Sequence, residues 1–172
     1  QVESLVKAFS LLDDSLQEDY AIVIAGNKGN AYEDVRSAVR DGKLEKKVFF
    51  LGYVQDNDLK YLYKRAKVFV FPSLIEGFGL PVLEAMGHGI PVIASDIPVI
   101  AEVAGDAAVL VDPRDIPALR DAMSQVLLNG EMRKSLIIKC SERIKDFSWE
   151  NTARKTLAIY KKLAGTNDKS SP

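Results

Sequence analysis

Two glutamates flank a glycine-rich stretch, and this is the strongest chemical signal in the sequence. Glu76 and Glu84 stand on either side of Gly77 and Gly79. Glycines let the backbone approach a ligand closely, and N–H groups at the start of a helix attract phosphate. A carboxylate beside a phosphate is unfavourable unless it accepts hydrogen bonds from donors such as sugar hydroxyls. The pattern therefore favours a ligand that carries phosphates and sugars, with Glu84 on a ribose diol and Glu76 on a second sugar.

The spacing of the two glutamates is explained equally well without a ligand. In that second interpretation Glu76 and Glu84 flank a capped, solvated turn. A dinucleotide-binding fingerprint is excluded, because Val82 stands where that motif needs a third glycine. Pro81 suits the first turn of a helix, where its missing N–H costs little. The stretch is therefore expected to join a strand to a helix.

Apolar runs and helical patterns alternate along the chain. Short apolar runs without polar alternation are typical of strands buried on both faces of a parallel sheet, and they occupy residues 20–26, 48–52, 68–71, 92–94 and 108–111. Helices are expected at the amino terminus, after Asn30 and Asp56 as N-caps, over 79–87 and 100–103, after the cap Asp115, along 132–147, and after the cap Ser148. This order predicts an α/β fold with a doubly wound, mostly parallel, Rossmann-like sheet and extra C-terminal helices. Ligands of such sheets bind at the carboxyl ends of the strands, where the glutamate-flanked stretch lies.

Composition narrows the function further. The 172 residues hold 47% hydrophobic and 27% charged residues and a formal net charge of −1, which indicates one globular domain without the basic excess of a nucleic-acid binder. The single cysteine excludes an internal disulfide framework and a cysteine-rich zinc site, and the single histidine disfavours a histidine-based metal cluster. We expect Cys140 in the core and His88 to pack at a helix C-terminus. No apolar run is long enough to cross a bilayer. The domain is expected over residues 1–164, with 165–172 as a disordered tail.

Further segments match one family in order and spacing, at residues 50–54, 59–66, 70–73, 89–96, 102–105, 110–113 and 147–150. Together with the stretch from Glu76 to Met86, they resemble the C-terminal, donor-binding domain of GT-B-fold, family 4-type retaining glycosyltransferases. Trp149 resembles the structural tryptophan that anchors the last helix in that family. The resemblance covers nearly the whole chain up to that helix.

The resemblance implies a role for each residue of the site. Glu84 would bind the ribose of a nucleoside diphosphate sugar, and Glu76 would act as the catalytic carboxylate that contacts the transferred sugar. Diphosphate and sugar hydroxyls would be held by the backbone N–H groups of Gly77, Phe78, Gly79 and Leu80. Tyr53 and Val54 would line the base pocket, and Ser73 would assist from the end of its strand. Neither a cofactor nor a metal is implied, and the likeness of residues 102–108 to mannosyltransferases of surface polysaccharide assembly favours GDP-mannose as donor.

Several parts of the family pattern are missing from the chain. A basic pair that neutralises the leaving diphosphate, the strand before that pair and the N-terminal acceptor domain are absent, so the chain reads as a donor-binding fragment that is inactive alone. Two interpretations of Lys28 are open. It could partly substitute for the basic pair, or it could be a solvated loop lysine, and the second interpretation is favoured. The parent enzyme would be cytoplasmic and would use a sugar or lipid-linked acceptor, the latter drawing it to a membrane surface.

Other functions are weighed against this one. A UDP- or ADP-sugar is the alternative donor, and a GT-B nucleotide-sugar epimerase is the alternative enzyme. A phosphorylase would need a cofactor lysine motif that the sequence lacks. A non-catalytic α/β module of the phosphoacceptor type would need an aspartate closing a central strand. The second and third predicted strands instead end in Leu51-Gly52 and Phe71-Pro72, which disfavours that module.

Overall fold

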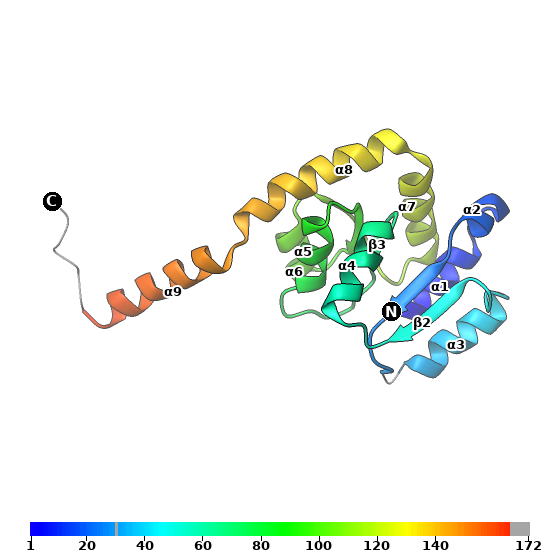
Figure 1. Ribbon diagram of the computed structural model, residues 1–172, viewed down its shortest axis with the longest axis horizontal. Helices are drawn as coiled ribbons and strands as arrows, with labels where there is room; N and C mark the ends of the chain where they lie inside the picture. Colours follow the sequence, from blue (N-terminus) through cyan, green and yellow to red (C-terminus); the bar gives the residue numbers. More distant parts are fainter. Residues whose placement is uncertain (30, 166–172) are drawn as a thin grey trace.

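Strands and helices alternate along the chain, as the sequence predicts. The structure is a computed structural model that describes residues 1–29 and 31–165 (Figure 1). Its elements are α1 (Val2–Ser10), α2 (Asp14–Asp19), β1 (Ile22–Ala25), α3 (Tyr32–Asp41), β2 (Val48–Gly52), α4 (Asp56–Arg65), β3 (Phe69–Phe71), α5 (Leu80–Gly87), β4 (Val92–Ser95), α6 (Pro98–Ala104), β5 (Ala108–Val111), α7 (Ile116–Leu128), α8 (Gly130–Arg143), the 3₁₀ turn η1 (Ile144–Asp146) and α9 (Trp149–Leu163). The predicted α/β fold with extra C-terminal helices is confirmed.

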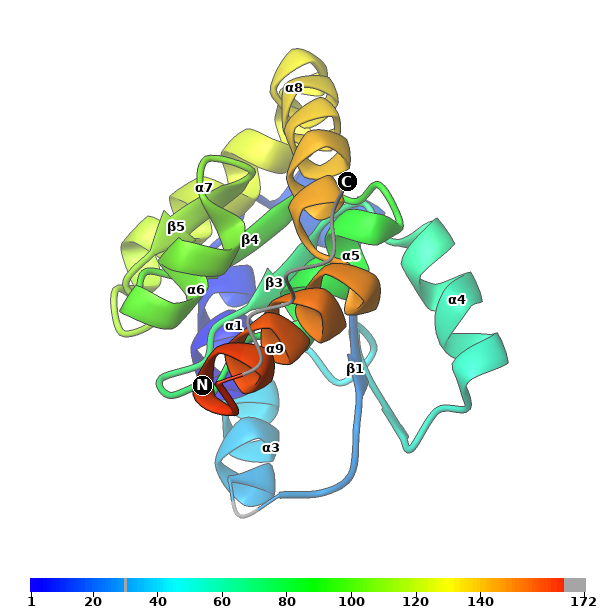
Figure 2. The ribbon, with the colours of Figure 1, turned by 90° about the vertical axis from the view of Figure 1, so that its left-hand side faces the viewer.

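The strands pair in parallel, which confirms that part of the predicted fold, but they form two groups. β1 pairs with β2, and β3, β4 and β5 form a separate three-stranded group in that order. Figure 2 shows β3, β4 and β5 together, with β1 apart from them. Apolar runs predict that strands exist, whereas the choice of neighbours depends on how the helices between them pack. The carboxyl ends of β3 and β4 still share one edge, so the loop after β3 lies at a ligand-binding edge.

The strands differ in how far they are buried. All four residues of β4 are buried, as predicted for a strand covered on both faces. β1 and β2 do not follow that prediction, because Val23, Phe49 and Leu51 are 49%, 48% and 46% exposed. The opposite face of these two strands packs with α1 and α3 in one core cluster. Within the described residues, helices therefore cover only one face of β1 and β2.

Two apolar clusters meet at β4. The first joins α1, α3 and α7 to the strands and includes Phe9, Ile93 and Leu119. The second joins α5 and α6 to the other face of β3 and β4 and includes Val92 and Ala94. Because successive side chains of a strand point to opposite faces, Ile93 enters one cluster and its neighbours enter the other. β4 is thus the central strand of its group, and it fixes the end of β3 beside it.

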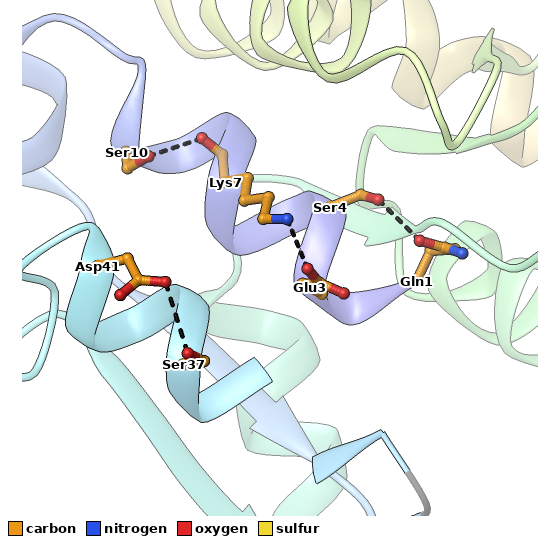
Figure 3. A network of polar contacts seen from close by, with 7 residues as sticks. All are labelled: Gln1, Glu3, Ser4, Lys7, Ser10, Ser37 and Asp41. Atoms are coloured by element: carbon orange, nitrogen blue, oxygen red, sulfur yellow. Dashed lines mark hydrogen bonds and ion pairs between the residues drawn. The ribbon is translucent and has the colours of Figure 1, made fainter. Parts of the chain in front are cut away.

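Short polar contacts surround the amphipathic helix α1 (Figure 3). The buried hydroxyl of Ser4 donates a hydrogen bond to Oε1 of Gln1 at 3.0 Å, which satisfies a polar group that would otherwise cost free energy. Lys7 pairs with Glu3 one turn earlier on the solvent side of the helix. The opposite side of α1, including Phe9, enters the core.

Helix starts agree with the sequence where a cap residue acts through its side chain. Asp115 accepts a hydrogen bond from the Ala118 N–H at 2.9 Å, and Ser148 accepts one from the Asn151 N–H at 3.0 Å, so both predicted caps are confirmed. The cap predicted at Asp56 is wrong: that residue is already helical and Gln55 precedes it without a side-chain cap. Asn30 lies outside the described residues.

The last helix extends away from the body of the molecule (Figure 1). No residue of α9 is buried, and the Trp149 side chain is 82% exposed. The expectation that Trp149 anchors this helix is therefore wrong for the described chain, because no described element packs over its ring. The predicted tail at 165–172 lies outside the described residues beyond Gly165.

Candidate functional site

The loop that carries the two glutamates joins β3 to α5, as predicted. It runs from Pro72 to Gly79, and Gly79 is the N-cap of α5 with φ 91° and ψ 39°. This left-handed conformation favours glycine. Pro81 lies in the first turn of the helix, where its ring fits the helical φ and its missing N–H leaves no intrahelical bond unmade.

Neighbouring elements fix both ends of this loop. The buried Ser95 hydroxyl, at the end of β4, donates a hydrogen bond to the Phe71 carbonyl at 3.3 Å. Near the other end of the loop, the Phe78 ring meets the Phe147 ring edge to face, with centroids 6.1 Å apart. The Arg143 guanidinium lies over the other ring of that pair, 4.9 Å from the Phe147 centroid. The loop is therefore held by β4 and by the segment after α8.

A row of backbone N–H groups at the start of α5 has no partner in the described part of the chain. Hydrogen bonds are not donated there by the N–H groups of four successive residues, Gly77, Phe78, Gly79 and Leu80. The helix has neither a side-chain cap nor an acidic residue in its first turn. Such N–H groups and the positive end of the helix dipole suit an anion. The four residues predicted to hold diphosphate are thus brought together at one helix end.

Ser73 and Glu76 lie within the same loop. The Ser73 hydroxyl donates a hydrogen bond to the Ile75 carbonyl at 3.1 Å, so in this structure it shapes the loop. The Glu76 side chain is half-buried. Both residues belong to the loop between β3 and α5, and Glu76 directly precedes the first of the unpaired N–H groups.

Glu84 lies one turn further along α5, and its partner comes from α4. The Tyr63 hydroxyl donates a hydrogen bond to Oε2 of Glu84 at 3.2 Å. Burial, followed by the nearby charge of Glu84, raises the pKa of Tyr63 to about 12, so the hydroxyl keeps its proton at neutral pH. Sequence reasoning gave Tyr63 no role. The contact between Tyr63 and Glu84 depends on how α4 packs beside α5, and no local sequence motif predicts it.

The predicted base-pocket residues line an open hollow between the end of β2 and α4. Its volume is about 600 Å³. Tyr53 and Val54 lie on its wall together with residues of β2, of α4 and of the connection between them, namely Leu51, Gln55, Asp58, Tyr61 and Leu62. Leu62 borders the hollow and the next residue, Tyr63, contacts Glu84. α4 therefore contributes Leu62 to the wall of the hollow and Tyr63 to the hydrogen bond with Glu84.

The remaining titratable candidates lie elsewhere. The Lys28 ammonium stacks over the Tyr32 ring, 4.7 Å from its centroid, and so packs on α3. His88 is the C-cap of α5, and its ring stacks on that of Tyr63, which agrees with the packing role expected for it. Cys140 is fully buried, and its thiol lies 3.2 Å from the Ala107 carbonyl, as expected for a core residue.

Two features are absent from the described residues, a cluster of metal-ligating side chains and a membrane-spanning helix. Across 1–29 and 31–165, no group of three or more histidine, cysteine, aspartate or glutamate side chains could hold a metal ion. No helix in the same ranges is long and apolar enough to cross a membrane.

Fold and site together define the class of the protein. It is a Rossmann-like α/β domain whose candidate ligand site is a strand-to-helix loop with unpaired N–H groups, bordered by two carboxylates. The chain matches the family described as "Glycosyl transferases group 1" over residues 1–143. It is 38% identical over 162 residues to the O-antigen chain mannosyltransferase B of Escherichia coli, a match that covers 94% of this chain and 42% of that protein. The chain belongs to the group 1 glycosyl transferase family.

Solved structures agree with this assignment. Sucrose-phosphate synthase from Thermosynechococcus elongatus is 27% identical, with a TM-score of 0.83 over 96% of this chain and 43% of that one. The C-terminal domain of a glycosyl transferase group 1 family protein from Francisella tularensis shares the fold at 22% identity, with a TM-score of 0.74 over 84% of this chain and 77% of that one. These comparisons confirm the GT-B assignment made from the sequence. The chain spans less than half the length of the curated relatives it matches.

Proposed function

We propose that the chain is the donor-binding domain of a retaining hexosyltransferase and that its ligand is a nucleoside diphosphate sugar. The observation that carries this proposal is the row of four unpaired N–H groups from Gly77 to Leu80. Such a row can hold a diphosphate without a basic side chain beside it. Glu84 then accepts hydrogen bonds from the ribose hydroxyls, and Glu76 contacts the transferred sugar.

The proposed place of the base is the hollow beside Tyr53 and Val54, which α4 borders, and α4 also carries the partner of Glu84. GDP-mannose is the proposed donor, since the family relative quoted above is a mannosyltransferase of O-antigen chains. The proposed acceptor is a sugar or a lipid-linked sugar, held by a further domain of the parent protein. The process it serves would be the assembly of surface polysaccharide or glycolipid.

Retention of configuration is proposed to follow from attack on the face that the diphosphate leaves. The bond between the sugar C1 and the phosphate oxygen breaks, the acceptor oxygen bonds to C1 on that same face, and the phosphate takes the acceptor proton. The N–H groups at the start of α5 stabilise the charge that develops on the leaving diphosphate. Without the acceptor domain, the 172-residue chain binds donor and transfers no sugar.

Ligand-observed NMR on the 172-residue chain tests this proposal with GDP, UDP, ADP, GDP-mannose and UDP-glucose, and with NAD as the control. Selective binding of GDP and GDP-mannose is expected, in the millimolar range or tighter. Selective binding of UDP and UDP-glucose instead would keep the donor-binding role and replace the mannosyl donor. If NAD competed as well as any nucleoside diphosphate, the donor-site assignment would fall.

A further inference from the structure

We infer that Tyr63 is a positioning residue, which holds the Glu84 carboxylate in the orientation that a ribose diol requires. This inference rests on the proposed donor-binding function and names a residue on which the ribose contact depends. Tyr63 comes from α4 and Glu84 from α5, so the contact joins the two helices that border the site.

The Tyr63 ring is held firmly enough to act as a fixed reference point. Tyr63 is the buried residue of α4, a helix whose other side chains are at least partly exposed. Its ring stacks on that of His88, with centroids 4.8 Å apart and planes 16° apart. The Phe69 ring of β3 packs at a tilt, with its centroid 5.8 Å away. A ring packed by both neighbours has little freedom, so its hydroxyl has a defined place.

Glu84 needs such a partner because its side chain lies at the surface. An exposed glutamate samples many rotamers, and fixing them costs conformational entropy when a ligand binds. The hydrogen bond from Tyr63 at 3.2 Å occupies one site on Oε2 and leaves Oε1 to accept from a hydroxyl. The carboxylate is thus oriented before the ligand arrives, which improves affinity by reducing the cost of ordering.

The position of Tyr63 in α4 also relates the ribose site to the hollow. Leu62, its neighbour, lines the hollow that Tyr53 and Val54 border. α4 therefore borders the proposed base pocket through Leu62 and holds the proposed ribose ligand Glu84 through Tyr63. A shift of α4 would move both contacts together.

The test compares Tyr63→Phe with the unchanged 172-residue chain by calorimetric titration. Removing the hydroxyl leaves the ring and its stacking in place. The probes are GDP and UDP, each with its 2′,3′-dideoxy counterpart, which lacks the hydroxyls that Glu84 binds. Tyr63→Phe is expected to weaken binding of the ribonucleotide about three- to tenfold, the usual range for one hydrogen bond, and to leave binding of the dideoxy compound unchanged. A merely structural defect would weaken both compounds equally.

Two controls sharpen the result. Tyr160→Phe makes the same chemical change at an exposed site on α9 and is expected to change neither affinity. In a Glu84→Ala background, Tyr63→Phe is expected to have no further effect on ribonucleotide affinity. Equal affinities of Tyr63→Phe and the unchanged chain for the ribonucleotide would overturn the inference while the proposed function stood. If the unchanged chain did not bind ribonucleotides, or bound dideoxy compounds as tightly, the donor or ribose assignment would itself fall.

Discussion

Gly79 of the α5 N-cap lies against Ile100 of α6, so closely that a β-carbon built on Gly79 would be 2.5 Å from Cδ1 of Ile100. The same glycine has φ 91°, in the left-handed region that side chains disfavour. Two independent features, the positive φ and the close approach of Ile100, therefore favour glycine here. Together they set the direction in which α5 begins and the place of its free N–H groups.

Gly79→Ala is expected to lower the free energy of unfolding by roughly 2–6 kcal/mol, because backbone strain and overpacking each cost about 1–3 kcal/mol. Urea unfolding measures this loss. Ile100→Val removes the methyl group that the new β-carbon would meet. In the double variant it should therefore restore the part of the stability lost to overpacking, while the part lost to backbone strain remains. If the close approach to Ile100 were unimportant, the losses of stability measured for Gly79→Ala and for Ile100→Val alone would simply add in the double variant.

Gly77→Ala is the matched control for that substitution. Gly77 has open space around its Cα and no positive φ. Its replacement should therefore change the free energy of unfolding by less than about 0.5 kcal/mol. A loss as large as that of Gly79→Ala would mean that the whole loop, rather than its last residue, resists side chains.

Glu84→Gln is expected to weaken nucleoside diphosphate binding by about 1–3 kcal/mol, through loss of a charged hydrogen-bond acceptor. The thermal midpoint should change little because the side chain lies at the surface. Calorimetric titration and a thermal melt measure the two quantities. Glu18→Gln, an exposed change on α2, is the control for altered net charge. A large fall in the thermal midpoint with unchanged binding would make Glu84 a structural residue.

Local sequence signals predicted the parts of the structure that local physics determines. The loop from Pro72 to Gly79 and the caps at Asp115 and Ser148 depend on glycine, proline and short polar side chains acting within a few residues. The short helix α2 was missed, because its six residues give too little periodicity to recognise.

Long-range packing accounts for what the sequence could not predict. The hydrogen bond between Tyr63 and Glu84 and the stacking of Tyr63 on His88 join separate helices, and neither follows from spacing. The sequence predicts that the face of β1 and β2 that carries Val23 and Phe49 is buried, whereas the structure exposes it. An apolar run does not indicate which elements cover a strand. The roles of the site residues remain predictions that binding experiments test.

Removal of α9 is expected to leave the stability of the rest of the chain unchanged, because the helix buries no residue in the described structure. A chain ending at Phe147 should have the same thermal midpoint as the full chain. Trp149, the single tryptophan, should show the red-shifted emission of an exposed indole and be quenched readily by iodide. A blue-shifted, protected emission would show instead that α9 packs against the chain in solution.

Cys140 should make the folded chain less stable in alkaline solution. Burial raises the pKa of its thiol from 9.0 to about 11. Below pH 9 the thiol is protonated in both states. Between pH 9 and 11 the unfolded chain releases this proton while the folded chain keeps it, so the free energy of unfolding falls as the pH rises.

The size of that fall should be at most about 1.4 kcal/mol for each pH unit in the window. Urea unfolding of the unchanged chain and of Cys140→Ala at pH 8, 9, 10 and 11 measures it. The variant loses packing at every pH, but its stability should decline less steeply than that of the unchanged chain. Other alkaline groups, such as Tyr63, titrate in both proteins and cancel in the difference. Parallel pH dependences would mean that the Cys140 thiol ionises as easily in the folded chain as in the unfolded one.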